Sequence, residues 1–134
     1  MPIRLTKAQA KTYGIRVPKA RAPRLRPTHR PDGYRSQLEA DYAQVLQQQV
    51  LAGTLVRWVY EPWQFVLVPG AKPVRYTPDF LAIPTRGKWT IFECKGLWRP
   101  KDRVVIKLCA HAWPEFRVIG VTRVRGVWQF EAFH

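Results

Sequence analysis

Hydrophobic and polar positions after residue 33 form one helical segment, and two segments typical of strands follow it. Residues 34–52 contain neither proline nor glycine and are rich in good helix formers, and Gly53 then supplies a stop signal. They predict a first helix. Residues 54–60 and 63–68 are rich in β-branched and aromatic side chains, so they predict two strands separated by Glu61-Pro62.

The rest of the pattern predicts more strands around a second helix. The expected elements are, in order, strands at about 74–83 and 88–95, a helix at 102–113, and strands at 116–124 and 127–130. Pro114 requires the second helix to end before it, and Arg125-Gly126 favours a closing hairpin. This order contains no internal repeat. It predicts an α/β fold, with α+β as the alternative, in which a mixed β-sheet is flanked by two helices and completed by a C-terminal hairpin.

Positive charge is concentrated ahead of the predicted fold. The chain has 23 Lys and Arg against 9 Asp and Glu, a formal charge of +14 over 134 residues. Residues 1–31 hold no acid, five prolines and nine basic residues, which are Arg4, Lys7, Lys11, Arg16, Lys19, Arg21, Arg24, Arg26 and Arg30. We therefore expect an extended basic arm at 1–33 and one folded domain at 34–134.

Such an arm is typical of proteins that bind a polyanion, and nucleic acid is the partner that its charge favours. An anionic membrane is disfavoured because no amphipathic apolar face accompanies the charge. The alternative is a tail that only improves solubility.

Composition excludes several other classes of protein. With two cysteines and three histidines the chain has no disulfide framework and no zinc-site spacing. No apolar run is long enough to span a membrane, and the N-terminus lacks the apolar stretch of a secretory signal. The expectation is a soluble, intracellular protein.

Acidic residues are rare, so their positions are informative. Asp79 follows Pro78 in the third predicted strand, and Glu93 and Lys95 close the fourth. If these strands pair through the turn at 84–87, Asp79 lies near Glu93, whose side chain shares a face with that of Lys95. Two carboxylates this close favour a hard cation, Mg²⁺ or Mn²⁺, and Lys95 would orient the attacking water. The alternative is a solvated Glu93–Lys95 ion pair.

A third carboxylate is expected to face inward. Glu39 shares a face of the first predicted helix with Tyr42, Leu46 and Val50, so it points toward the core, where a charge needs a partner. The alternative is a capping box, since Ser36 and Glu39 have the spacing of one.

Together these residues resemble the PD-(D/E)XK nuclease superfamily. More closely, the chain resembles a small phage and prophage family, formerly described as a domain of unknown function, in the motifs Tyr34-Arg35-Ser36-x-Leu38-Glu39, Trp58-x-Tyr60-Glu61-Pro62, Tyr76-Thr77-Pro78-Asp79-Phe80, Glu93-x-Lys95-Gly96 and Asp102-x-x-x-Ile106-Lys107. The resemblance covers residues 34–119. It implies a restriction-endonuclease-like core and a metal-dependent DNA endonuclease.

The resemblance assigns roles to individual residues. It implies that Glu39, Asp79, Glu93 and Lys95 are catalytic. Asp79 and Glu93 would hold the metal, and Glu39 would contribute through a water molecule. The Cys94 side chain is expected to face the core, so only its backbone carbonyl would reach the metal.

Several basic residues are candidates for contacts to DNA phosphate. They are Arg35, Lys101, Arg103 and Lys107 in the domain and Arg21, Arg24, Arg26 and Arg30 in the arm. For Arg103 and Lys107 the alternative is a solvated helix face. Trp98, in the loop after the fourth strand, is a candidate for stacking on a base.

These features together lead to a prediction of function. We expect a Mg²⁺-dependent endonuclease in the bacterial cytoplasm that cuts branched DNA as a Holliday-junction resolvase does, because the compact domain has no appended module for reading sequence. Two cuts need two active sites, which favours a homodimer. Alternatives within the class are a nicking, mismatch or transposase-like end-cutting enzyme. The alternative from another class is a DNA-binding protein with a nuclease-like fold and no activity.

Overall fold

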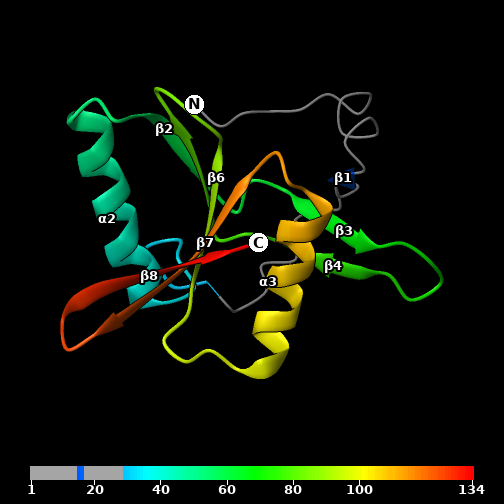
Figure 1. Ribbon diagram of the computed structural model, residues 1–134. Coiled ribbons are helices and arrows are strands. Elements are labelled where there is room, and N and C mark those ends of the chain that lie inside the picture. Colours follow the sequence, from blue (N-terminus) through cyan, green and yellow to red (C-terminus); the bar gives the residue numbers. More distant parts are fainter. Residues whose placement is uncertain (1–14, 17–28) are drawn as a thin grey trace.

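The structure is a computed structural model that describes residues 15–16 and 29–134 (Figure 1). The elements in chain order are β1 (Ile15–Arg16), α2 (Gln37–Leu51), β2 (Leu55–Tyr60), β3 (Gln64–Val68), β4 (Val74–Tyr76), β5 (Phe80–Pro84), β6 (Thr90–Cys94), α3 (Pro100–Ala112), β7 (Arg117–Val124) and β8 (Val127–Phe133). The basic arm expected at 1–33 lies outside the described residues except for 15–16 and 29–33.

The main sheet has five strands in the order β2-β5-β6-β7-β8. Only β6 and β7 run parallel, and α3 makes the crossover between them; the other neighbouring pairs are antiparallel. The expected α/β fold with a mixed sheet, two helices and a C-terminal hairpin is confirmed at this level.

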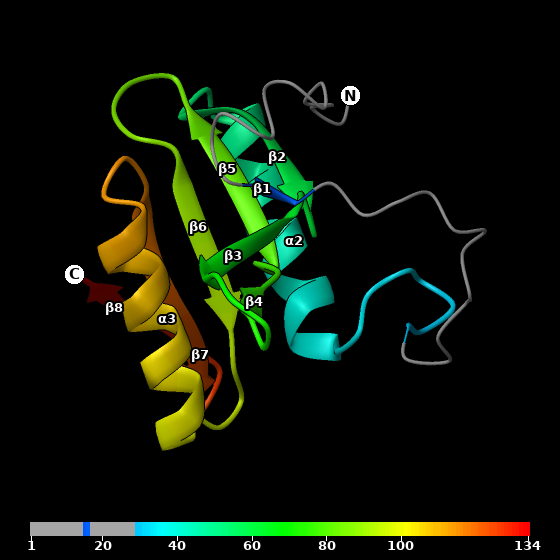
Figure 2. The ribbon, with the colours of Figure 1, turned by 90° about the vertical axis from the view of Figure 1, so that its right-hand side faces the viewer.

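The two helices cover opposite faces of the sheet (Figures 1 and 2). Under α2, Tyr42 and Leu46 pack with Phe80 and Val121 of the sheet. On the other face, the Ile106 side chain of α3 belongs to a second buried cluster. Because successive strand residues alternate between these faces, the central strands of the sheet contribute to both clusters.

One predicted strand is in fact two. The segment expected at 74–83 breaks at Thr77-Pro78-Asp79 into β4 and β5, and these belong to different sheets. Pro78 has no N–H to donate to a strand ladder, which explains why pairing stops there. β4 instead joins β1 and β3 in a three-stranded sheet on the α3 side of the molecule (Figure 2).

The remaining boundaries differ by a few residues from those expected. α3 begins two residues early, with Pro100 in its first turn and the Asp102 carboxylate accepting from the Arg99 N–H at 3.1 Å. β8 extends to Phe133 because the hairpin pairing continues from Val124↔Val127 to Val118↔Phe133. Within the described ranges, neither helix has the length and apolar character needed to cross a bilayer.

Candidate active site

Asp79 and Glu93 meet where the pairing of β5 with β6 ends. The last paired residues are Phe80 and Phe92, so Asp79 and Glu93 are the next opposed positions of the same register. The Asp79 carboxylate accepts a hydrogen bond from the backbone N–H of Cys94 at 2.8 Å. The Asp79 side chain thus accepts a hydrogen bond from the strand β6 at the point where the backbone pairing with β5 stops. This bond fixes the carboxylate beside the end of β6.

Glu93 is buried and held by two side chains. Its Oε2 accepts a hydrogen bond of 2.6 Å from the hydroxyl of Tyr76, and its Oε1 lies 3.4 Å from the Nζ of Lys95. The side chain of Glu93 is 9% exposed and that of Lys95 is 36% exposed. The ammonium of Lys95 is therefore available to a substrate, while the carboxylate beneath it is shielded from water.

The alternative to a metal site is a solvated Glu93–Lys95 ion pair. The ion pair exists, but burial on the Glu93 side distinguishes it from a solvated pair. Tyr76, which completes the arrangement, comes from the three-stranded sheet.

The ionisable groups at this site perturb one another. Burial raises the pKa of Asp79 well above its usual value, and the charges of Glu93 and Glu39 raise it further. Burial also raises the pKa of Glu93, although the hydrogen bond from Tyr76 and the charge of Lys95 oppose the shift. For Lys95, desolvation lowers the pKa, but attraction to Glu93, Asp79 and Asp102 outweighs it and the pKa rises overall.

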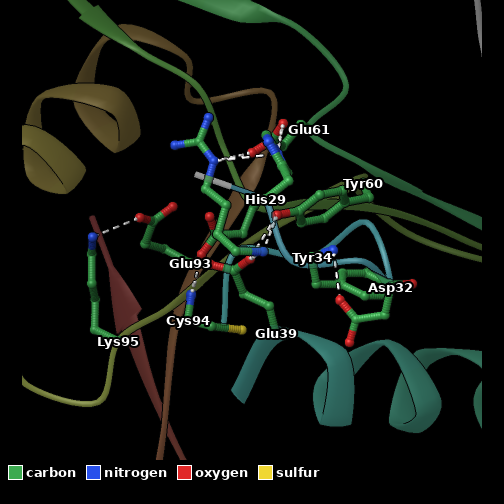
Figure 3. A network of polar contacts seen from close by, with 11 residues as sticks. His29, Asp32, Tyr34, Glu39, Tyr60, Glu61, Glu93, Cys94 and Lys95 are labelled. Carbon is green, nitrogen blue, oxygen red and sulfur yellow. Dashed lines mark hydrogen bonds and ion pairs between the residues drawn. The ribbon is translucent and has the colours of Figure 1, made fainter. Parts of the chain in front are cut away.

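Glu39 faces this cluster from α2, as its helical position predicted. It is buried together with Tyr42 and Leu46. Its Oε2 accepts a 2.6 Å hydrogen bond from the Tyr60 hydroxyl and a 3.1 Å bond from the Arg35 N–H. Figure 3 shows Glu39 and Tyr60 facing each other beside Glu93.

Only one of the two hydrogen bonds of a capping box is present at Ser36 and Glu39. Ser36 caps α2, with its Oγ accepting from the Glu39 N–H at 3.1 Å. The Glu39 carboxylate bonds instead to the N–H of Arg35, one residue before the position that a capping box requires. Its second partner, Tyr60, lies on β2, so the carboxylate joins the helix to the sheet as well.

A further ion-pair cluster borders the site. Glu61 Oε1 lies 2.7 Å from Arg35 Nε, and Glu61 Oε2 lies 3.2 Å from His29 Nε2. The Glu61 backbone adopts φ +44° and donates its N–H to the Asp79 carbonyl at 2.8 Å. These contacts fix the chain entering α2 against the corner after β2, where Figure 3 shows His29 and Tyr60 beside Glu61.

The hydroxyl donors Tyr60 and Tyr76 had no role in the sequence analysis beyond their place in the family motifs. Burial and the neighbouring carboxylates raise the pKa of both phenols, so both stay protonated and able to donate. The only local signal was that each tyrosine lies one to three residues from an acid, Glu61 or Asp79.

Mg²⁺ or Mn²⁺ fits the donors at this site on chemical grounds. Among the described residues, no group of three or more His, Cys, Asp or Glu side chains is arranged to hold a metal ion. Mg²⁺ does not require such a group, because proteins bind it through one or two carboxylates while water and phosphate supply the other ligands. Asp79 and Glu93 provide two, and burial raises the pKa of both although the charge of Lys95 opposes the shift.

The backbone carbonyl of Cys94 faces the same side of β6 as Asp79. The Lys95 N–H points toward β7 and bonds the Val121 carbonyl at 2.9 Å, whereas the Cys94 N–H points toward Asp79. The Cys94 carbonyl therefore also faces the Asp79 side. Continuing the register places Pro78 opposite Cys94, and Pro78 has no N–H to donate. The Cys94 side chain is buried under α2, as expected.

Comparison with known proteins finds no neighbour of this chain. No family model, no curated protein and no solved structure matches it. The chemistry of the site is accordingly argued below from its own geometry.

Three of the candidate phosphate-contacting residues form ion pairs with acidic side chains of the protein. Arg103 makes two bonds to Glu131, at 2.7 and 2.9 Å, and Arg35 pairs with Glu61. Arg30 lies 3.2 Å from Asp32. Lys101 and Lys107 are exposed on α3, while Arg21, Arg24 and Arg26 lie outside the described residues.

Trp98, the candidate for base stacking, is partly buried and packs against the hydrophobic cluster under α3. Its ring centroid lies 5.5 Å from that of Phe133, and the Arg103 guanidinium lies 5.8 Å from the Trp98 ring.

Proposed function

We propose that this protein is a metal-dependent endonuclease of the PD-(D/E)XK type that hydrolyses phosphodiester bonds in DNA. The observation that carries the proposal is the meeting of Asp79, Glu93 and Lys95 at the end of the β5–β6 pair, with Glu39 facing them from α2. A half-buried Asp79 beside a buried Glu93 is unfavourable for folding, because burial and mutual repulsion both oppose ionisation of the pair. A catalytic role is the reason that best accounts for the presence of this Asp79–Glu93 pair.

In this proposal Asp79 and Glu93 would hold the cation. The Cys94 carbonyl would supply a third protein oxygen, and Glu39 would act through a water molecule. When bound, Mg²⁺ or Mn²⁺ would polarise the scissile phosphate and activate water. The two acids would ionise together more readily beside the cation, because its charge offsets the repulsion that raises the pKa of Asp79.

The protein side chains would perform the remaining steps. The Lys95 ammonium, held by Glu93 and exposed on its other side, would orient the water and balance negative charge on the phosphate. Tyr76 and Tyr60 would keep the carboxylates of Glu93 and Glu39 in fixed orientations.

The finer parts of the proposal concern the substrate. We favour branched DNA, cut by a homodimer as a Holliday-junction resolvase cuts it, in the cytoplasm of a bacterial host. The nine basic residues of the segment 1–31 support a DNA partner, since phosphate contacts do not depend on base sequence. A two-fold symmetric pair would place one active site on each of two strands.

The proposal is tested by the variants Asp79→Asn and Glu93→Gln. Each removes a metal ligand and adds no repulsion toward phosphate, so cleavage should fall by at least about 100-fold while DNA binding is retained or tightened. Cleavage and binding are measured on the same DNA, by gel assay with Mg²⁺ and by fluorescence anisotropy without it. Either variant cutting at a near wild-type rate would remove the metal-site assignment.

A further inference from the structure

A pocket of about 400 Å³ lies at the other end of β6 from Glu93 and Lys95. Its walls come from the end of α3, the start of β7 and the end of β8, and both views show the end of β8 beside α3 (Figures 1 and 2). Lys88 precedes β6, and Arg117 pairs with Thr90, the first residue of β6. The pocket is thus separated from the candidate active site by the length of β6.

The rim of this pocket carries only basic ionisable side chains. Lys88, His111, Arg117 and His134 line it, and no aspartate or glutamate does so among the described residues. All four side chains are exposed. Lys88 Nζ donates to the Pro114 carbonyl at 2.9 Å, which holds the ammonium at the rim while its other two N–H groups stay available.

The walls of the pocket are apolar and aromatic. Phe116 is partly exposed toward it, while its ring packs on Phe65 at a centroid distance of 5.8 Å, so its position is fixed from behind. Phe133 is buried and forms another part of the wall. A volume of this size is in the range of small-molecule sites and exceeds the needs of a bare phosphate ion.

We propose that this pocket binds an unpaired nucleotide of the DNA substrate. The phosphate would contact Lys88 and Arg117, and the base would lie against Phe116, because nucleotides combine an anion with a flat apolar ring. The inference rests on the proposed function, since it assigns the site to the same DNA. Flaps and the opened centres of junctions offer unpaired nucleotides that a linear duplex lacks, so this pocket would contribute to a preference for such branched DNA.

The first test uses thymidine 5′-monophosphate in EDTA, followed by NMR or calorimetry. We expect saturable binding that is at least about tenfold tighter than binding of thymidine or inorganic phosphate alone, because the rim and the wall both contribute. Arg117→Gln should weaken it at least fivefold. Lys72→Gln, which removes one charge from the exposed turn between β3 and β4, should leave it unchanged. No binding, or equal effects of the two variants, would overturn the proposal.

The second test distinguishes DNA from free nucleotide. Binding of a single-strand flap DNA and a blunt duplex is compared in EDTA, and Arg117→Gln should lower the flap-to-duplex affinity ratio at least threefold while Lys72→Gln does not. An unchanged ratio would overturn the assignment to DNA. Thermal melting of each variant checks that it is folded. Because neither test involves cleavage, the pocket can fail while Mg²⁺-dependent cleavage persists, and the reverse is also possible.

Discussion

At the scale of single residues, the ionised Asp79 side chain lowers the free energy of unfolding of the metal-free protein. Burial and the charges of Glu93 and Glu39 raise its pKa above the ordinary value of 3.8. The folded state therefore keeps the proton at pH values where the unfolded chain has released it. It follows that the stability contributed by this group is greatest below about pH 4 and is lost as the pH rises through the folded-state pKa.

Asp79→Asn should stabilise the metal-free protein at neutral pH, because asparagine keeps an acceptor for the Cys94 N–H and carries no charge. We expect the free energy of unfolding in EDTA to rise on the order of 1 kcal/mol at pH 7.5, and the gain to vanish near pH 4. Urea unfolding at the two pH values measures it. Added Mg²⁺ should stabilise the wild type and not the variant; a variant less stable at pH 7.5 would contradict the account of this charge.

Lys95→Ala should reduce turnover much more than metal binding. An ammonium cannot ligate Mg²⁺, and its role here is to orient water and balance charge, so we expect single-turnover cleavage to fall by about 100-fold or more. The Mg²⁺ concentration that gives half-maximal thermal stabilisation should shift little. A drop in metal affinity equal to the drop in rate would mean that Lys95 only supports Glu93 structurally.

Tyr76→Phe tests whether the hydroxyl from β4 positions Glu93. Removing a 2.6 Å donor from the buried Glu93 carboxylate takes away one of its two described side-chain partners and leaves Lys95, so Mg²⁺ affinity should weaken by about tenfold. Tyr60→Phe is the matched control, since it removes the same bond from Glu39, which acts through water, and should weaken Mg²⁺ binding less. Thermal shift against Mg²⁺ concentration measures both, and equal effects would argue against the distinction between the two acids.

At the scale of elements, local sequence patterns were sufficient to predict most helices and strands but not to predict which sheet each strand joins. The sequence predicted Asp79 near Glu93 on the condition that the strands pair through the turn at 84–87, and β5 and β6 do pair there. The split of 74–83 into β4 and β5 was missed although Pro78 marks it, because the residues on both sides of Thr77-Pro78-Asp79 suit a strand and their assignment to different sheets depends on pairing in space. Tyr76 was missed as a partner of Glu93 for the same reason, since the two residues meet across different sheets.

Gly120 shows how closely the loop after β6 packs on the sheet. A Cβ at this position would lie 2.7 Å from Trp98 and 2.8 Å from Phe133. Gly120→Ala should therefore destabilise the protein by about 1–3 kcal/mol in urea unfolding. Gly96→Ala is the control, because a Cβ there meets nothing within 4 Å, and it should change stability by less than about 0.5 kcal/mol. Equal stabilities of the two variants would mean that Trp98 is not held in this packing.

At the scale of the whole molecule, charge is divided between the folded domain and the segment before it. Residues 1–31 carry +9 of the total +14, and this segment is where we expect contacts to DNA that do not read sequence. Sequence composition gives this distribution of charge directly. It cannot predict how the segment lies, and most of it falls outside the described residues.

Replacing Arg21, Arg24 and Arg26 together with glutamine should weaken DNA binding without changing the fold. The slope of log affinity against log salt should flatten by roughly 0.9 for each DNA phosphate that the variant no longer neutralises. Fluorescence anisotropy at several salt concentrations measures the slope. Arg75→Gln, which removes one charge from an exposed side chain of β4, is the single-charge control. Unchanged affinity at physiological salt would favour a segment that only improves solubility.

The central claim is that the cluster of Asp79, Glu93 and Lys95 cuts DNA with the help of a divalent cation. The most direct measurement incubates the wild-type protein with linear duplex, flap and four-way junction DNA of matched sequence, once with Mg²⁺ and once with EDTA. The account predicts cleavage with Mg²⁺ alone and faster cleavage of the branched substrates. Binding of all three DNAs with no cleavage in Mg²⁺ or Mn²⁺ would contradict it and favour a DNA-binding protein without activity.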